Sequence, residues 1–377
     1  MLLLAVACAR RPPAPLPDRI DAALSRAGSY LIARQGPDGS IRSEMYPFFR
    51  DGYSLTPLVL AALFALPDDG AHAAAYARGV DFLATIVGPD GKLRDDLHAP
   101  RYPLYSMAIG VLVLNVGKND RHRAARDALV QGLRERQLVE RNGWRPDDPS
   151  YGGWSYFDGI PTRPAAPDEE REANLSATLF AVGALALAGT PPDDPSLVAA
   201  RAFVGRCRRA SDGGFFFSPA IPDGNKAAAD AAGFRSYGSM TADGVRAMLR
   251  LGASGADVAP AAAWLDARFE AERNPGDFPP VNEVRRGSSY FYWAWSSAHA
   301  LRDLGKPTVR GGQVRWAEAL AEALLAKQRP DGSWANPMSE MREDDPLVAT
   351  SFATAALGVC RLVLRGEYRS HAARPVR

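Results

Sequence analysis

Apolar residues recur at helical spacing along most of the chain, and no segment alternates apolar and polar residues as a strand does. Segment 313–328 is one example, with an apolar stripe formed by Val314, Ala317, Leu320 and Leu324. Such a stripe predicts a helix that is half exposed and packs one face on a core. The same pattern predicts helices at 18–35, 72–87, 121–139, 195–209, 258–272 and 313–328.

Each of these segments is followed by a turn and then by a more uniformly apolar segment, which predicts a helix buried on most sides. The buried helices are expected at 55–66, 102–116, 175–188, 240–251, 290–304 and 346–364. Six hairpins, each pairing one amphipathic with one apolar helix, predict an all-α fold. We expect an (α/α)6 toroid with an inner and an outer ring of six helices each.

A glycine-containing turn ends each amphipathic helix. Glycine suits this position because it adopts positive φ without a Cβ clash. The turn glycines are Gly39, Gly91, Gly143, Gly213, Gly276 and Gly332, at intervals of 52 to 70 residues. This period indicates a repeat array with loop insertions.

The connections differ in length according to their direction. Those from an apolar to an amphipathic helix are short, whereas the reverse connections at 141–173, 211–239 and 273–289 are long. Long ordered loops usually carry function. We therefore expect the functional site at the end of the ring where the inner helices begin.

The turn at 328–334 reads Gln-Arg-Pro-Asp-Gly-Ser-Trp. It resembles the Gln-x-x-x-Gly-x-Trp repeat of the squalene-hopene cyclase and protein prenyltransferase β-subunit superfamily. Residues 35–41 are a copy with Ile41 in the Trp place, and 87–93 are a weaker copy. The resemblance covers 18–365 as an architecture. It implies an α/α toroid with a central cavity for an isoprenoid-like ligand.

The resemblance also directs attention to an acid, because squalene-hopene cyclases protonate an alkene with an Asp-x-Asp-Asp string. This chain has no such string, and the most similar sequence is Glu-Asp-Asp-Pro at 343–346. Asp344 and Asp345 are therefore candidate acids. The alternative is helix capping, since Asp at the N-cap followed by Pro is a common helix start.

Two further ionisable residues lie within predicted inner helices. Asp243 is a candidate cavity acid, although Arg246 at i+3 offers an ordinary ion pair. His299 is a candidate general base, although Asp303 at i+4 would make it an ordinary paired histidine.

Aromatic residues gather at or before the starts of the predicted inner helices. Their faces can stabilise carbocations, stack on sugar rings or fill a core. The aromatic residues that could line a cavity are Tyr53, Tyr102, Tyr105, Trp154, Tyr156, Tyr237, Tyr290, Tyr292, Trp293 and Trp295. The candidate ligand-binding residues among them are Tyr53, Tyr102, Trp154, Tyr237, Tyr290, Tyr292 and Trp293.

Composition narrows the classes of partner. The chain has 377 residues, 46% of them hydrophobic, and a net charge of +2, which argues against a disordered protein and against nucleic-acid binding. Cys207 and Cys360 have no zinc-ligand spacing, so we expect buried thiols, no metal and no cofactor.

The N-terminus suggests export. Residues 1–8 are apolar up to Cys8 and resemble the end of a bacterial lipoprotein signal, with Cys8 as the lipidated residue and a periplasmic, membrane-anchored product. The alternative is an ordinary N-terminus of a cytoplasmic protein. We expect a Pro-rich linker at 9–17, a single toroid domain at 18–365 and a disordered tail at 366–377.

The leading functional hypothesis is a cyclase-like toroid that binds an apolar isoprenoid-like small molecule. A polysaccharide lyase or glycosidase on the same fold is the first alternative, and a non-catalytic, lipid-anchored binding or scaffold protein is the second. The lining of the cavity distinguishes the three hypotheses. Aromatic walls fit a cyclase-like protein, converging polar groups fit a carbohydrate-active enzyme, and a filled centre fits a scaffold protein.

Overall fold

The computed structural model describes residues 14–66, 71–93, 102–116, 120–166 and 168–367. Cys8 and the predicted signal segment lie outside these residues. Within them the fold is helical, apart from a small antiparallel pair of strands, β1 (Ala229–Asp230) and β2 (Gly233–Phe234).

The helices alternate along the chain between an outer and an inner position. The outer helices are α1 (Leu16–Ile32), α3 (Ala71–Ile86), α5 (Arg123–Glu135), α7 (Pro195–Arg206), α9 (Gly255–Arg268) and α12 (Trp316–Lys327). The inner helices are α2 (Leu55–Leu63), α4 (Pro103–Val116), α6 (Leu175–Leu187), α8 (Gly238–Arg250), α11 (Tyr290–Asp303) and α13 (Pro346–Leu364).

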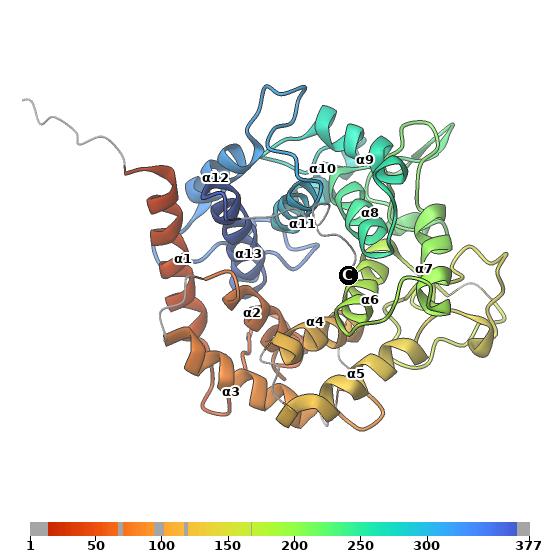
Figure 1. The fold of residues 1–377 in the computed structure, drawn as a ribbon, viewed down its shortest axis with the longest axis horizontal. Coiled ribbons are helices and arrows are strands. Elements are labelled where there is room, and N and C mark those ends of the chain that lie inside the picture. Colours follow the sequence, from red (N-terminus) through yellow and green to blue (C-terminus); the bar gives the residue numbers. More distant parts are fainter. Residues whose placement is uncertain (1–13, 67–70, 94–101, 117–119, 167, 368–377) are drawn as a thin grey trace, which may run out of the picture.

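The inner helices form a closed ring (Figure 1). Helix α2 contacts α4, α4 contacts α6, α6 contacts α8, α8 contacts α11, and α11 contacts α13, which returns to α2. The predicted (α/α)6 toroid is confirmed.

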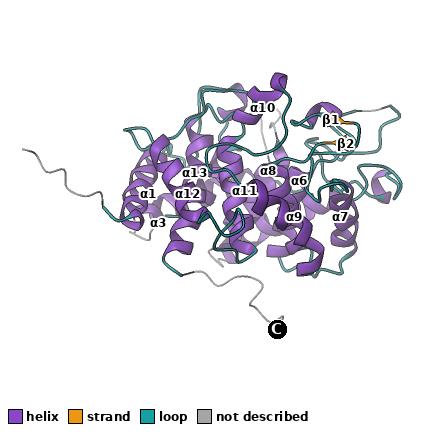
Figure 2. Cartoon of the chain, turned by 90° about the horizontal axis from the view of Figure 1, so that it is seen from above, coloured by secondary structure: helices purple, strands orange, loops and turns teal. Residues whose placement is uncertain are grey.

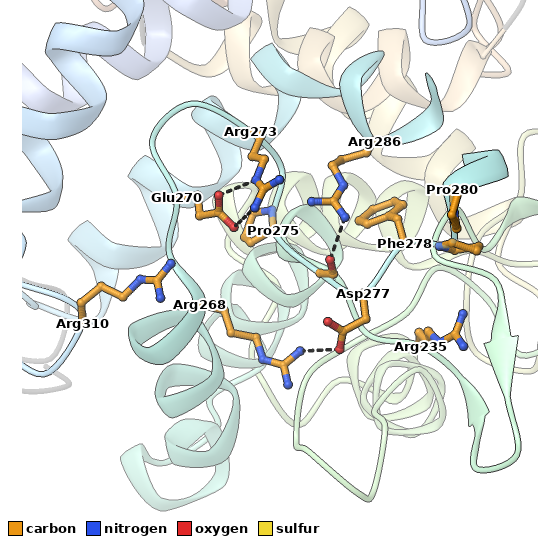
Figure 3. A pocket seen from close by; sticks show the side chains of 12 residues that line it. Arg235, Arg268, Glu270, Arg273, Pro275, Asp277, Phe278, Pro280, Arg286 and Arg310 are labelled. Carbon is orange, nitrogen blue, oxygen red and sulfur yellow. Dashed lines mark hydrogen bonds and ion pairs between the residues drawn. The ribbon is translucent and has the colours of Figure 1, made fainter. Parts of the chain in front are cut away.

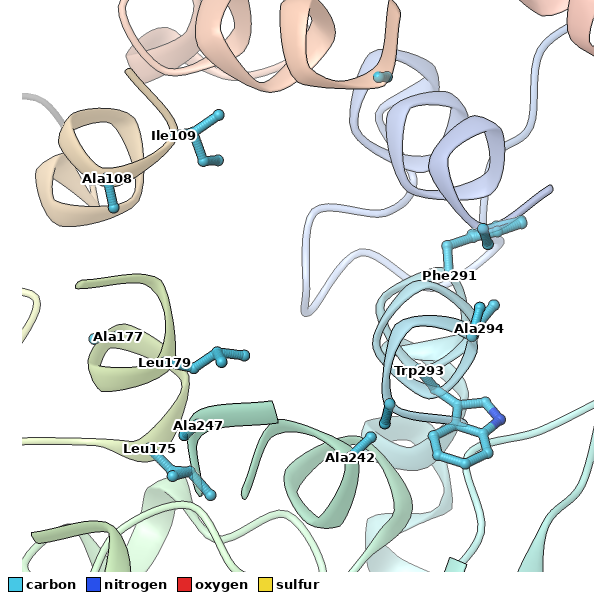
Figure 4. Close-up of a cluster of buried hydrophobic side chains, with 14 of the residues drawn as sticks. Ala108, Ile109, Leu175, Ala177, Leu179, Ala242, Ala247, Phe291, Trp293 and Ala294 are labelled. Carbon is cyan, nitrogen blue, oxygen red and sulfur yellow. The ribbon is translucent and has the colours of Figure 1, made fainter. Parts of the chain in front are cut away.

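Small and branched apolar side chains allow the inner helices to pack closely (Figure 4). Ala177, Ala242, Ala247 and Ala294 are fully buried. Because alanine adds little volume beyond the backbone, larger neighbours such as Leu179 fill the remaining space between helices. Helix α13 is long and apolar enough to cross a membrane, but here it is an inner helix with most of its residues buried.

Glutamine side chains at the ends of outer helices tie successive repeats together. The Gln35 amide donates to the carbonyl oxygens of Gly39 in its own turn and Ala75 in α3, at 3.0 and 2.8 Å. Gln137 makes the same pair of bonds to Gly152 and Ser196, at 2.9 and 2.7 Å.

The third repeat turn therefore lies at Gly152, and the prediction of Gly143 is corrected. Gly39 and Gly152 both have positive φ and approach the next outer helix so closely that an added Cβ would lie 2.2 and 2.0 Å from its carbonyl oxygens. Gly143 also has positive φ, but its nearest neighbour would be 3.6 Å away. The insertion at 138–150 hides the repeat from a reading of the sequence.

A second set of bonds connects the turns to the inner ring. The backbone N–H of Ile41 donates to the hydroxyl of Thr56 in α2 at 2.8 Å. Trp154, Phe215 and Trp334 make the same bond to Thr178, Thr241 and Thr350, at 3.0 to 3.1 Å. Each buried turn thus gains a hydrogen-bond partner from the helix that follows it.

The ends of the toroid are joined by α1 and the last hairpin. Asp21 of α1 pairs with Arg361 and Arg365, and Arg19 pairs with Glu322 of α12 at 2.7 Å. The Gln328 amide donates to the carbonyl oxygen of Ala23 in α1 at 2.9 Å. This hydrogen bond is equivalent to those that Gln35 and Gln137 make to the next outer helix, and it joins the last outer helix to the first.

Several details differ from the sequence-based prediction. Helix α1 begins at Leu16, so Leu16 and Pro17 belong to the toroid and not to the linker. The long loops hold the β1–β2 pair and a short helix, α10 (Glu283–Gly287), on one face of the ring (Figure 2).

Cys207 and Cys360 are buried free thiols, as expected.

Candidate functional site

A cavity of about 1130 Å³ lies at the end of the ring where the inner helices begin, the end that the loop lengths predict. All six inner helices contribute to its wall, through Leu55, Tyr105, Ser176, Met240, Tyr292 and Phe352 in chain order. Loops 47–49, 156–158, 217–226 and 340–343 complete it. The volume slightly exceeds the roughly 300–1,000 Å³ of most small-molecule sites.

The wall is strongly aromatic. Ring pairs hold it together, with Tyr105 against Phe180 at 4.8 Å and Tyr292 against Phe352 at 5.5 Å between centroids, both edge to face. The aromatic lining residues are Phe48, Phe49, Tyr102, Tyr105, Tyr156, Phe157, Phe180, Phe217, Tyr292 and Phe352.

A chain of hydroxyl groups leads from this wall into the protein. The Tyr156 and Tyr105 hydroxyls are 2.8 Å apart, and Tyr105 donates to Ser176 at 2.8 Å. The Ser176 and Tyr292 hydroxyls are 2.6 Å apart, and Tyr292 donates to Asp243 at 2.7 Å. Four inner helices, α4, α6, α11 and α8, therefore share one hydrogen-bonded path.

Asp243 at the end of the path has no exposed surface. It also accepts a hydrogen bond from Ser296, and the Arg246 guanidinium is 3.7 Å away and stacks over Trp295. Burial raises the pKa of Asp243 to about 6, against the lowering effects of Arg246 and the two hydroxyl donors. The carboxyl can thus change protonation state near neutral pH.

The groups around Asp243 keep their ordinary charge at that pH. Burial raises the pKa of Tyr292 and that of Tyr156 well above 10, so both phenols stay neutral. Burial lowers the pKa of Arg246 to about 10, which leaves it cationic at neutral pH.

Glu343 is a second buried carboxyl, and it lies in the cavity wall. It accepts hydrogen bonds from the backbone N–H groups of Phe291 and Tyr292, at 2.9 and 2.7 Å, and from the Asn336 amide at 3.0 Å. It therefore caps the start of α11, whose N-terminus favours a negative charge. Burial outweighs these donors and raises the pKa of Glu343 to about 7.

Its neighbours Asp344 and Asp345 have other contacts. Asp345 is the N-cap of α13 and accepts from the backbone N–H of Leu347 at 2.9 Å. Asp344 accepts from the Tyr46 hydroxyl at 2.6 Å. Neither belongs to the residues that line the cavity.

His299 lies deeper along α11, outside the cavity lining. Its ring packs against Trp295 at 5.6 Å, and its Nδ1 has no hydrogen-bond partner among the residues that the structure describes. Burial lowers the pKa of His299 well below 6.5, helped by the positive charges of nearby arginines, so the ring is neutral.

Of the predicted aromatic residues, Tyr102, Tyr105, Tyr156 and Tyr292 line the cavity, whereas Tyr53, Tyr237 and Trp295 lie outside its lining. The polar atoms of the other three point toward the outer helices and the loops that follow them. The indole N–H groups of Trp154 and Trp293 and the hydroxyl of Tyr290 donate to carbonyl oxygens of Leu133, Glu270 and Ala271, respectively. They hold the inner ring to the outer helices and the loops that follow them.

The sequence prediction missed the phenylalanines, Glu343 and Lys226 of the wall. Helical spacing could have found two of them. Phe180 and Phe352 follow the lining residues Ser176 and Val348 by four positions, which places them on the same helix face. Lys226 lies in a long loop, where spacing carries no such information.

A second pocket, of about 700 Å³, lies at the edge of the ring and is rich in arginine (Figure 3). Its guanidinium groups already have partners. Arg268 pairs with Asp277 at 3.1 Å, Arg273 pairs with Glu270, and Arg286 donates to the Gly276 carbonyl at 3.1 Å. The central cavity is therefore the stronger candidate site.

Comparison with known proteins shows what the fold resembles. No protein-family model matches the sequence, and no curated protein matches it. Among solved structures, a protein from Actinoplanes is 17% identical with a TM-score of 0.59, covering 91% of this chain and 99% of its own.

Two enzymes of different chemistry are similar to the same extent. The type II terpene cyclase MstE from Scytonema, in complex with geranylgeranyl dihydroxybenzoate, is 15% identical with a TM-score of 0.56, covering 93% of this chain and 99% of its own. An unsaturated glucuronyl hydrolase specific for heparin is 13% identical with a TM-score of 0.59, covering 93% and 98%. These similarities establish the class, an α/α toroid, and leave the reaction to be inferred from the site.

Proposed function

We propose that this protein binds an apolar, isoprenoid-like small molecule in the central cavity. The observation that carries the proposal is the wall of aromatic rings contributed by the inner helices and the loops before them. Such a wall offers a ligand large apolar contact area, and its ring faces stabilise positive charge. The similarity to a toroid that holds a geranylgeranyl compound supports the same ligand class.

We further propose that Asp243 exchanges protons with the ligand through the hydroxyl chain. A proton leaving Asp243 would pass to Tyr292 and along Ser176 and Tyr105 to Tyr156, each hydroxyl accepting one proton and releasing another. A carboxyl with a pKa of about 6 suits general acid–base catalysis near neutral pH. It is too weak an acid to protonate an isolated alkene, so we infer a polarised target, such as an epoxide or a carbonyl.

A carbohydrate ligand is the second candidate. The observation in its favour is the acidic rim of the cavity, where Asp158, Glu169, Glu170 and Glu340 join the aromatic wall. Carboxylates and ring faces in one cavity suit a sugar, which needs hydrogen-bond acceptors together with stacking surfaces. The similarity to a glucuronyl hydrolase supports the same candidate.

Substitution of Leu58 distinguishes the two candidates. Leu58 lies in the apolar part of the wall, so Leu58→Glu introduces a charge that an apolar ligand must desolvate. Calorimetric titration should show that geranylgeraniol binds the wild type and binds Leu58→Glu at least about tenfold more weakly. Leu58→Gln should also weaken the binding of geranylgeraniol, but by a smaller factor.

The matched control is Leu187→Glu, because Leu187 is exposed at the end of α6. It should bind geranylgeraniol as the wild type does, with thermal melting as the check on folding of all variants. Tight binding of a neutral oligosaccharide that Leu58→Glu leaves intact, with no binding of geranylgeraniol, would establish the carbohydrate candidate instead.

A further inference from the structure

Lys226 is a cation inside the aromatic cavity. It follows the short 3-10 turn Pro222–Gly224, and its backbone carbonyl accepts a hydrogen bond from Asn282 at 2.8 Å, which fixes its position. Its ammonium lies 5.4 Å from the centroid of the Phe217 ring and 6.0 Å from that of Tyr237. The side chain is half-buried because it faces the cavity.

The ammonium has no ion pair or hydrogen bond with any residue in the part of the chain that the structure describes. The acids near it are engaged elsewhere. Glu343 takes three N–H donors, Asp243 takes two hydroxyl donors, and Glu340 is 3.9 Å from Arg285. A half-buried positive charge beside an aromatic wall, without a contacting anion among the described residues, is available to an anionic ligand.

We propose that Lys226 anchors the carboxylate head group of an amphiphilic ligand whose apolar part lies along the aromatic wall. This inference rests on the proposed function and specifies its ligand class. The head group would sit between Lys226 and Arg285, which both line the cavity. The apolar part would extend toward Phe180 and Phe352 on the inner helices.

The charges favour a carboxylate over a diphosphate. Lys226 and Arg285 offer two cations, and the Arg285 guanidinium already donates to the Asp223 carbonyl at 2.6 Å. Glu340 and Glu343 stand nearby and repel a highly charged anion. The described residues also hold no group of three His, Cys, Asp or Glu for the metal that commonly accompanies a diphosphate.

The protonation of Lys226 gives the site a pH dependence. Burial, together with Arg285 on α10, lowers the pKa of Lys226 to about 8, while Asp243 on α8 and Glu343 and Glu340 before α13 act in the opposite direction. A bound carboxylate stabilises the ammonium form, so binding is linked to proton uptake. Affinity for a carboxylate should therefore fall as the pH rises from 7 to 9.

The test compares three C20 compounds by calorimetric titration: geranylgeranoic acid, geranylgeraniol and geranylgeranyl diphosphate. At pH 7 the wild type should bind the acid at least about tenfold more tightly than the alcohol, and this preference should shrink at pH 9. In Lys226→Met the affinity for the acid should fall at least about tenfold more than that for the alcohol. Lys226→Arg should retain the preference.

Lys92→Met is the matched control, because Lys92 is exposed in the turn after α3. It should retain the preference, and thermal melting should verify that each variant folds. Equal affinity of the wild type for acid and alcohol, or a preference that survives in Lys226→Met, would overturn the carboxylate site alone. If the wild type bound the diphosphate most tightly, the ligand would carry a diphosphate head group and the carboxylate proposal would be wrong. If the wild type bound none of the three compounds, the proposed function would be overturned together with this inference.

Discussion

Two buried aspartates show how position decides the role of a side chain. Asp243 and Asp345 both have no exposed surface, and burial raises the pKa of each. Asp345 caps α13, where its carboxylate replaces missing backbone partners. Asp243 instead accepts hydrogen bonds from Ser296 and from Tyr292, whose hydroxyl belongs to the path from the cavity, so the two aspartates have different kinds of partner.

The pKa of Asp243 makes the stability of the protein depend on pH. Its folded value of about 6 lies above the ordinary 3.8, so between pH 4 and 6 the folded state keeps a proton that the unfolded state has lost. This contribution favours folding below pH 4 and is lost as the pH rises through 6. The free energy of unfolding of the wild type, minus that of Asp243→Asn, should therefore fall across this window by roughly 3 kcal/mol, measured by urea unfolding.

Asp257→Asn is the control of opposite sign. Hydrogen bonds from Ser254 lower the pKa of Asp257, so its contribution is present at neutral pH and lost as the pH falls. The free energy of unfolding of the wild type, minus that of Asp257→Asn, should therefore decrease toward low pH. A flat profile for Asp243→Asn would show that the carboxyl titrates at its ordinary pKa.

Each helical hairpin is defined by its turn, and the turn depends on a close approach of backbones. Gly39, Gly91 and Gly152 all have positive φ and lie against a carbonyl of the next outer helix. Gln35 and Gln137 then bridge the turn to that helix. The repeat unit is thus a contact between neighbouring hairpins as well as a local structure.

Gly152 and Gly143 provide a matched pair that tests this assignment. Both have positive φ, so alanine costs about 1–2 kcal/mol of backbone strain at either position. At Gly152 the new Cβ would also lie 2.0 Å from the Ala199 carbonyl oxygen, which forces α7 to move. Urea unfolding should show a loss for Gly152→Ala at least about 2 kcal/mol larger than for Gly143→Ala. Equal losses would mean that the third turn does not pack as assigned.

The ring as a unit depends on contacts between residues some 300 positions apart. Gln328, at the end of α12, donates to Ala23 in α1 and to Gly332 in its own turn. Arg19 and Asp21 add ion pairs from α1 to the last hairpin. Closure encloses the cavity, because each inner helix, α13 included, supplies part of the wall.

Removal of the Gln328 amide should weaken the closure. Gln328→Ala leaves two buried carbonyl oxygens without that donor, at a cost of roughly 1–3 kcal/mol in the free energy of unfolding. Hydrogen exchange of the backbone amides of α1 should accelerate. Gln313→Ala, at an exposed position, should change neither quantity. Unchanged exchange in α1 after Gln328→Ala would argue that the ends are held together by other contacts.

The helices were predictable because their apolar spacing is a local property of the chain. The predicted bounds of α13 agree with the structure, and the other predicted helices overlap their observed counterparts. The end of the ring that carries the cavity followed from loop lengths. Within the wall, the sequence predicted only the four tyrosines Tyr102, Tyr105, Tyr156 and Tyr292, because polar aromatic residues such as Trp154 and Trp293 serve equally well to join the two rings.

The amino-acid sequence alone determined which segments are helical, which helices are buried and how many hairpins make up the ring. Periodicity encodes these properties, since burial of one face requires apolar residues at fixed intervals. Only the tertiary structure decided that Asp243 connects to the cavity through Tyr292 and that Lys226 faces the aromatic wall with no anion in contact among the described residues. These contacts join residues from different hairpins, and their pKa shifts arise from burial, which exists only once the ring has closed.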